Sequence, residues 1–147
     1  EGGVGYGYTA GAPSYANATS AIGLLCRMYL GWKRDNEQLI EGVKRIAAIG
    51  PATDTADFNY YAAQLLFQYT GGEGELWETW NTKLRNFLID AQAKEGHEKG
   101  SWFLTGHHSG AGGRLYSTAM CCMTLEVYYR HMPIYQRDAV EADFPEE

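Results

Sequence analysis

Three of the four histidines lie in one glycine-rich segment, residues 94–113. His107 and His108 are adjacent, and His97 and Glu98 precede them in the same segment, so the segment offers imidazole and carboxylate ligands for a metal ion. Adjacent histidine side chains diverge, however, and this spacing fits no standard zinc pattern. We therefore favour a structural or solvated loop over a metal-binding or catalytic one, and we predict neither a metal nor a cofactor.

The end of this segment, GAGGR, has the glycine content of a phosphate-binding loop but not its context. No strand precedes it and no Lys-Ser or Lys-Thr follows it. Arg114 would begin the next helix, where a positive charge is unfavourable. We expect Arg114 to form a structural ion pair, for instance with Asp57. The alternative is that Arg114, His107 and His108 contact an anionic ligand.

Helices must position these residues, because no segment has the alternation of a strand. Apolar residues recur at helical spacing in five stretches, with Asp35 and Asp57 as the expected N-caps of the second and third. The stretches are about 17–29, 35–49, 57–70, 74–93 and 114–131. Two glycine-containing loops, 1–16 and 94–113, complete this part of the chain. The expected fold class is all-α.

Three of these stretches resemble one another: ATSAIGLLCRMYLG, YYAAQLLFQYTGG and YSTAMCCMTLEVYY. Ala21, Ala62 and Ala119 coincide when the three are aligned. Two more amphipathic stretches alternate with them, which is typical of helical-hairpin repeats whose neighbours stack to bury a shared face. We therefore expect two layers, with the first, third and fifth helices inside and the second and fourth outside.

Length and composition limit the remaining possibilities. The 147 residues suffice for one domain, expected at 1–135, followed by an acidic tail at 136–147. The net charge of −6 argues against a nucleic-acid partner, and no apolar run is long enough for a transmembrane segment. The three cysteines fall in apolar helical pattern and are expected to be buried free thiols. The sequence lacks an initial Met, so we expect a fragment of a longer chain, and its localisation is unknown.

The sequence RNFLIDAQAKEGHEKGSW resembles the QW repeat of squalene–hopene and oxidosqualene cyclases, with Gln92 followed by Gly100 and Trp102. The next residues, GGRLYSTA, resemble the start of an inner helix in that superfamily and in protein prenyltransferase β subunits. The resemblance implies a partial α/α toroid, here an arc of five to six helices. It also implies that the Gln92 amide bonds exposed backbone at a helix end while the Trp102 ring stacks on it.

The chemistry of those families is only partly matched. Class II cyclases protonate their substrate with a D-x-D-D-T-A motif, which aligns with Asp57 to Ala62 and places Asn59 at the protonating position. The prenyltransferase zinc histidine aligns with Ser117, and no Asp-x-Cys pair occurs in the sequence. The remaining catalytic candidates are Asp57, Tyr60 and Tyr116. The tyrosines could stabilise a cation as cyclase aromatics do, although core packing is favoured for each.

We expect a squalene cyclase/prenyltransferase-like repeat domain that is non-catalytic by itself. It would present an aromatic-rich concave surface to an isoprenoid or other lipid, or to a protein partner. That partner would be a second copy in a homo-oligomer or the rest of its own parent chain. The alternative is that the chain is part of a class II terpenoid cyclase, of squalene–hopene type, acting on a polyprenyl substrate.

Overall fold

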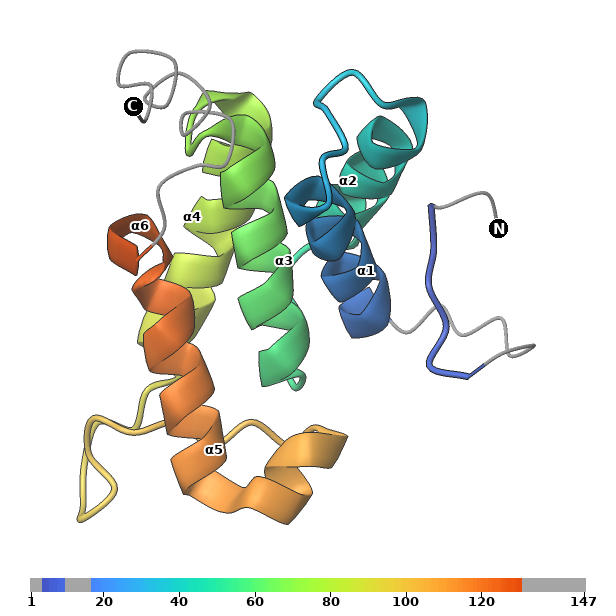
Figure 1. Ribbon diagram of the computed structural model, residues 1–147. Coiled ribbons are helices and arrows are strands. Elements are labelled where there is room, and N and C mark those ends of the chain that lie inside the picture. Colours follow the sequence, from blue (N-terminus) through green and yellow to red (C-terminus); the bar gives the residue numbers. More distant parts are fainter. Residues whose placement is uncertain (1–3, 10–16, 131–147) are drawn as a thin grey trace, which may run out of the picture.

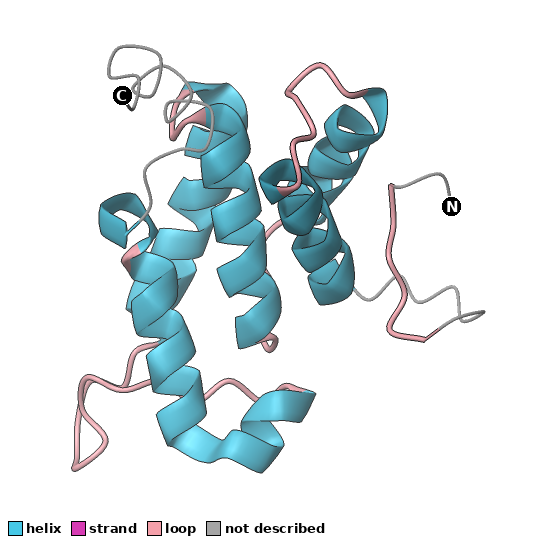
Figure 2. Ribbon diagram, viewed as in Figure 1, coloured by secondary structure: helices cyan, strands magenta, loops and turns pink. Residues whose placement is uncertain are grey.

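The computed structural model describes residues 4–9 and 17–130, and in this part of the chain all regular structure is helical (Figure 2). The prediction of an all-α fold is therefore confirmed. The expected acidic tail, 136–147, lies outside the described residues. The helices are α1 (Asn17–Tyr29), α2 (Glu37–Ile49), α3 (Ala56–Thr70), α4 (Gly74–Ala91), α5 (His107–Leu125) and the short α6 (Val127–Arg130).

The central helix is α3, which is buried along most of its length because α1, α2, α4 and α5 all pack against it. It packs most extensively on α1 and α5, and also on α2 and α4. Figure 1 shows α1, α3 and α5 side by side, with α2 and α4 behind them. The pairs α1–α2 and α3–α4 thus form hairpins, and the large apolar side chains of α3, such as Phe58, Leu65 and Leu66, form the middle of the core.

Two of the three repeated alanines lie in the hydrophobic core. Ala21 on α1 and Ala62 on α3 are both fully buried, so their small side chains allow these helices to pack together. Ala119, the third member of the set, is exposed on α5. The three alanines are therefore equivalent in burial on α1 and α3 but not on α5.

Two expected helix caps are wrong, each by one or two residues. The cap of α2 is Asn36, not Asp35: Asn36 Oδ1 accepts a hydrogen bond of 3.0 Å from the Leu39 amide. The cap of α3 is Thr55, and Asp57 lies inside the first turn. A carboxylate in that turn is favoured by the helix dipole and does not need to cap the helix.

The start of α5 also differs from the expectation. The helix begins at His107 rather than Arg114, and a break at Gly113 (φ 65°, ψ −161°) separates a short first part from the main part. The first part is polar and glycine-rich, so it carries no apolar periodicity in the sequence. The helix then ends at Leu125, before the expected His131. The expected loop 94–113 is therefore shorter, and His107 and His108 lie on a helix.

The prediction that all three cysteine thiols are buried is wrong for two of them. Cys121 is buried, whereas Cys26 and Cys122 are exposed. Cys26 and Cys122 lie on the outer sides of α1 and α5, where the apolar pattern continues beyond the packed face. In the described part of the chain, none of the helices has the length and hydrophobicity needed to cross a membrane.

Candidate functional site

Asp57 and His108, both candidates from the sequence, meet where the first turns of α3 and α5 approach each other. Asp57 Oδ2 lies 3.2 Å from His108 Nδ1, and the two side chains are 17% and 60% exposed. A backbone bond holds the two turns together: the Gly106 amide donates to the Asp54 carbonyl oxygen at 2.8 Å. A Cβ at Gly106 would lie 2.3 Å from that oxygen, so only glycine fits there.

Aromatic rings extend this contact. The His108 ring lies edge-on to Tyr116, with centroids 6.4 Å apart, and the His107 ring is 5.4 Å from that of His108. Tyr60 and Tyr61 also pack edge-to-face, at 5.0 Å. We call Asp57, Tyr60, Tyr61, His107, His108 and Tyr116 the aromatic cluster.

The environment of the cluster disfavours the ionised form of Tyr116. Burial raises the pKa of Tyr116 above its usual value, and the nearby Asp57 carboxylate and Tyr61 raise it further. Its hydroxyl, protonated at neutral pH as in any tyrosine of ordinary or raised pKa, can donate a hydrogen bond. The cluster thus combines partly exposed aromatic rings with a neutral hydroxyl group.

Arg114 is not part of this cluster. Its Nη2 lies 2.9 Å from Glu98 Oε2, its Nη1 donates to Ser101 Oγ at 3.3 Å, and the guanidinium lies over the Phe103 ring at 5.4 Å. The expected structural ion pair thus forms with Glu98 instead of Asp57. The break at Gly113 separates Arg114 from the turn that carries His107 and His108.

Gln92, Gly100 and Trp102 form one connection at the end of α4. Gln92 Nε2 donates to the Gly100 carbonyl oxygen at 2.9 Å, and the buried Trp102 indole donates to the Leu88 carbonyl oxygen at 2.7 Å. The Trp102 amide also donates to Thr118 Oγ1 on α5 at 3.1 Å. The side-chain amide of Gln92 therefore bonds the backbone of the loop. The indole N–H of Trp102, not the Gln92 amide, bonds the end of α4.

The two positions that would carry cyclase or prenyltransferase chemistry hold buried polar side chains. Asn59 accepts from the Ala52 amide and donates to the Ala52 carbonyl oxygen, both at 2.8 Å. Ser117 donates to Ser109 Oγ at 3.0 Å and accepts from the Leu104 amide at 3.3 Å. Asn59 is 1% exposed and Ser117 is fully buried. Both side chains join backbone segments, which is a structural use of their polar atoms.

Within residues 4–9 and 17–130, no three His, Cys, Asp or Glu side chains are grouped so that they could hold a metal ion. His97, expected beside His107 and His108 in the metal alternative, is 94% exposed, and its Nε2 lies 3.8 Å from Glu98 Oε1. The metal-loop alternative therefore has no support in the described residues.

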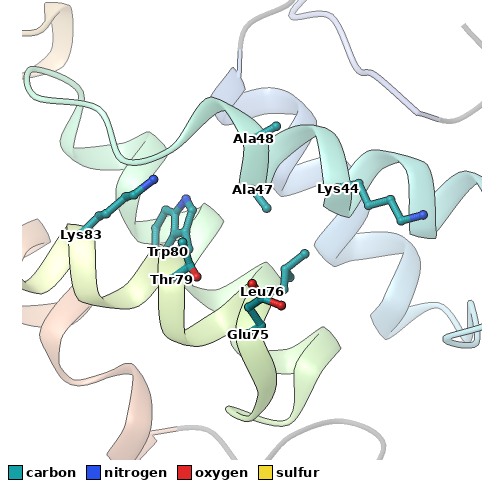
Figure 3. Close-up of a pocket in the computed structure, with 8 residues that line it drawn as sticks. All are labelled: Lys44, Ala47, Ala48, Glu75, Leu76, Thr79, Trp80 and Lys83. Atoms are coloured by element: carbon teal, nitrogen blue, oxygen red, sulfur yellow. The ribbon is translucent and has the colours of Figure 1, made fainter.

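A groove of about 360 Å³, which was not predicted from the sequence, lies between α2 and α4 (Figure 3). Its lining comes from Lys44, Ala47 and Ala48 on α2 and from five residues of α4, among them Trp80 and Lys83. The Trp80 indole nitrogen is buried and has no hydrogen-bond partner. The sequence gives no signal for this groove, because Trp80 has the spacing of an ordinary core residue.

Searches of protein-family models, curated proteins and solved structures return no match to this chain.

Proposed function

We propose that this chain is a helical-hairpin repeat module, of the type found in terpenoid cyclases and prenyltransferase β subunits, that binds an isoprenoid or similar lipid without transforming it. Two features support the repeat assignment. The hairpins α1–α2 and α3–α4 are consecutive in the chain, and α3 packs against both helices of the first hairpin. The Gln92, Gly100 and Trp102 connection fixes the end of one hairpin to the segment that leads to α5.

The proposal that the module is not catalytic is carried by one observation: the side chains of Asn59 and Ser117 are engaged in structural hydrogen bonds. An acid at the Asn59 position would have to release a proton to an alkene or epoxide. An amide cannot do so, and this one has both its oxygen and its nitrogen bonded to Ala52. A zinc ligand at the Ser117 position would need a histidine, and the serine there is bonded to Ser109 and Leu104.

The aromatic cluster is the proposed contact surface for the lipid. Its tyrosine and histidine rings are partly exposed, so their faces can cover a hydrocarbon chain. The neutral Tyr116 hydroxyl and the Asp57–His108 pair can bond a terminal hydroxyl group. An isoprenoid alcohol such as farnesol satisfies both requirements and is therefore the proposed class of ligand.

Nuclear magnetic resonance (NMR) of the full chain with farnesol tests this proposal. The chain has only four histidines, so the ring signals of His107 and His108 can be assigned by single substitution. We expect farnesol to shift these two signals and leave that of His97 unchanged. Y116A and Y60A should weaken the effect, whereas Y8A, at a tyrosine that is 85% exposed outside the cluster, should not. Unchanged His107 and His108 signals at saturating farnesol would refute the proposal.

One observation favours the cyclase alternative. Asp57, which aligns with the first acid of the cyclase motif, is held beside His108, so a carboxyl and an imidazole lie together at the aromatic cluster. Incubating the protein with squalene and with farnesyl diphosphate, followed by gas chromatography, separates the two functions. A cyclised product that disappears in D57N would favour the cyclase, and intact substrate would favour the binding module.

We also propose that a second copy of the chain, one of the partners expected from the sequence, binds to α5. Leu115, Ala119 and Cys122 are exposed along one side of α5, and Leu115 is 82% exposed. Apolar residues at this spacing form a continuous stripe, which can bury itself against a second copy of the chain. Sedimentation at increasing protein concentration should show a dimer that L115E abolishes. A monomer at every concentration would exclude the second copy.

A further inference from the structure

We propose that the groove between α2 and α4 binds a single-chain amphiphile with an anionic headgroup, such as an alkyl phosphate or a long-chain carboxylate. This site is separate from the aromatic cluster and does not depend on the function proposed above. Its volume of about 360 Å³ lies within the range of roughly 300–1,000 Å³ that is usual for small-molecule sites.

The apolar part of the lining can accept a hydrocarbon chain. Ala47 and Ala48 on α2 face Leu76 and the Trp80 ring on α4 across the groove (Figure 3). The two alanines leave room between the helices, and both α2 and α4 rest on α3. A chain lying along this groove would cover apolar surface that is otherwise open to water.

The polar part of the lining consists mainly of hydrogen-bond donors. Trp80 is 2% exposed, and its indole nitrogen, which can only donate, has no acceptor. Lys44 and Lys83 add two ammonium groups against the single carboxylate of Glu75, so the lining is positive in a chain of net charge −6. A buried donor without an acceptor is unfavourable. A ligand that supplies anionic acceptor oxygens would satisfy it.

Figure 3 indicates which end would hold the headgroup. Lys83 and Trp80 lie together at one end of the groove, whereas Glu75 lies near Leu76 and Lys44 lies at the far side. The end with the indole N–H and the Lys83 ammonium therefore has donors without the carboxylate. We place the headgroup there and the chain along Leu76 and Ala47.

The indole N–H signals of the ¹⁵N-labelled full chain provide a direct test, because the chain has only four tryptophans. W80F assigns the Trp80 signal by its loss. Decyl phosphate or decanoate, kept below the micelle concentration, should move that signal, since a new acceptor changes the environment of the N–H. Decanol should bind at least roughly tenfold more weakly, and inorganic phosphate should leave the signal unchanged, because each lacks one half of the recognised chemistry.

Substitutions of exposed lysines distinguish binding in this groove from nonspecific attraction of the anion to positive charge. K83Q should weaken decyl phosphate binding by roughly fivefold and K44Q by less. K99Q removes the same charge at an exposed position outside the groove and should have no effect. The proposal is wrong if the Trp80 signal does not move with either amphiphile, or if K83Q and K99Q bind equally well. These lysines are exposed, so their substitution leaves the fold intact even if W80F is destabilised.

Discussion

The indole nitrogen of Trp102 donates a hydrogen bond of 2.7 Å to the carbonyl oxygen of Leu88, a residue 14 positions earlier in the chain. Leu88 belongs to the last full turn of α4. Its carbonyl oxygen also accepts the backbone N–H of Gln92, the C-cap of α4, at 3.2 Å, so the Trp102 indole is its second donor. The segment that follows α4 is thereby attached to the end of the helix before it reaches α5.

Substitution of Trp102 measures this attachment. W102F keeps most of the buried ring and removes the donor, so we expect it to lower the free energy of unfolding by about 1 kcal/mol. W102A also leaves a cavity and should cost about 3–5 kcal/mol. Urea denaturation followed by circular dichroism measures both values. If W102F is as stable as the parent chain, the hydrogen bond contributes nothing to stability. Q92A, at a partly exposed amide, serves as the milder control.

Restoring an acid at position 59 should damage the fold. In N59D a carboxylate would replace the amide whose nitrogen donates to the Ala52 carbonyl oxygen at 2.8 Å, and two oxygens would then face each other. We expect a loss of about 3 kcal/mol at neutral pH. The loss should shrink at acidic pH, where a protonated carboxyl can donate again. Denaturation at several pH values checks this, and a stability loss independent of pH would contradict it.

Two glycine-to-alanine changes in helices should have opposite effects. Alanine is the better helix former, by about 0.8–1 kcal/mol. At Gly110 a Cβ would meet nothing within 4 Å, so G110A should stabilise the protein. At Gly42 a Cβ would lie 2.6 Å from a methyl carbon of Leu24, which is fully buried, so G42A should destabilise it. Thermal unfolding gives the sign of each change, and equal signs would show that Leu24 moves aside without cost.

The three cysteines should react at two different rates. Cys26 and Cys122 are exposed, and Cys121 is buried. Burial and the neighbouring Cys122 raise the pKa of the Cys121 thiol to about 12, so almost no reactive thiolate is present at neutral pH. Mass spectrometry after brief treatment with a maleimide should find two labels on the native protein and three after denaturation. Rapid labelling of all three would show that α5 opens readily.

The raised pKa of Cys121 also predicts alkaline sensitivity. A thiol whose pKa is higher in the folded state than in the unfolded chain stabilises the fold fully below the unfolded value, 9.0. Above that pH the unfolded chain loses its proton first, so the stability falls until the folded pKa of about 12 is reached. C121A should therefore flatten the loss of stability above pH 9. Denaturation curves between pH 7 and 10.5 test this. Equal slopes for the two proteins would contradict it.

Much of the architecture could be predicted from the sequence because it depends on local patterns. Apolar residues at helical spacing located the main helices, and Gly71 stops α3 in the expected place, with a φ of 78°. The first part of α5 was missed for the same reason: GHHSGAGG has no apolar stripe, and the turn is held by the long-range bond from Gly106 to Asp54. The caps at Asn36 and Thr55 were missed because several neighbouring polar residues are equally able to fill them.

The sequence by itself determined the fold class and the residue types available for chemistry, since helical periodicity and side-chain identity are local properties. Only the tertiary structure decided which of those residues meet. It placed Asp57 beside His108 and Arg114 beside Glu98, and it left the Trp80 indole without an acceptor at the α2–α4 groove. These contacts depend on how α3, α4 and α5 pack and on the break at Gly113. Contacts between residues far apart in the chain produce no periodic pattern in the sequence, so the sequence does not predict them.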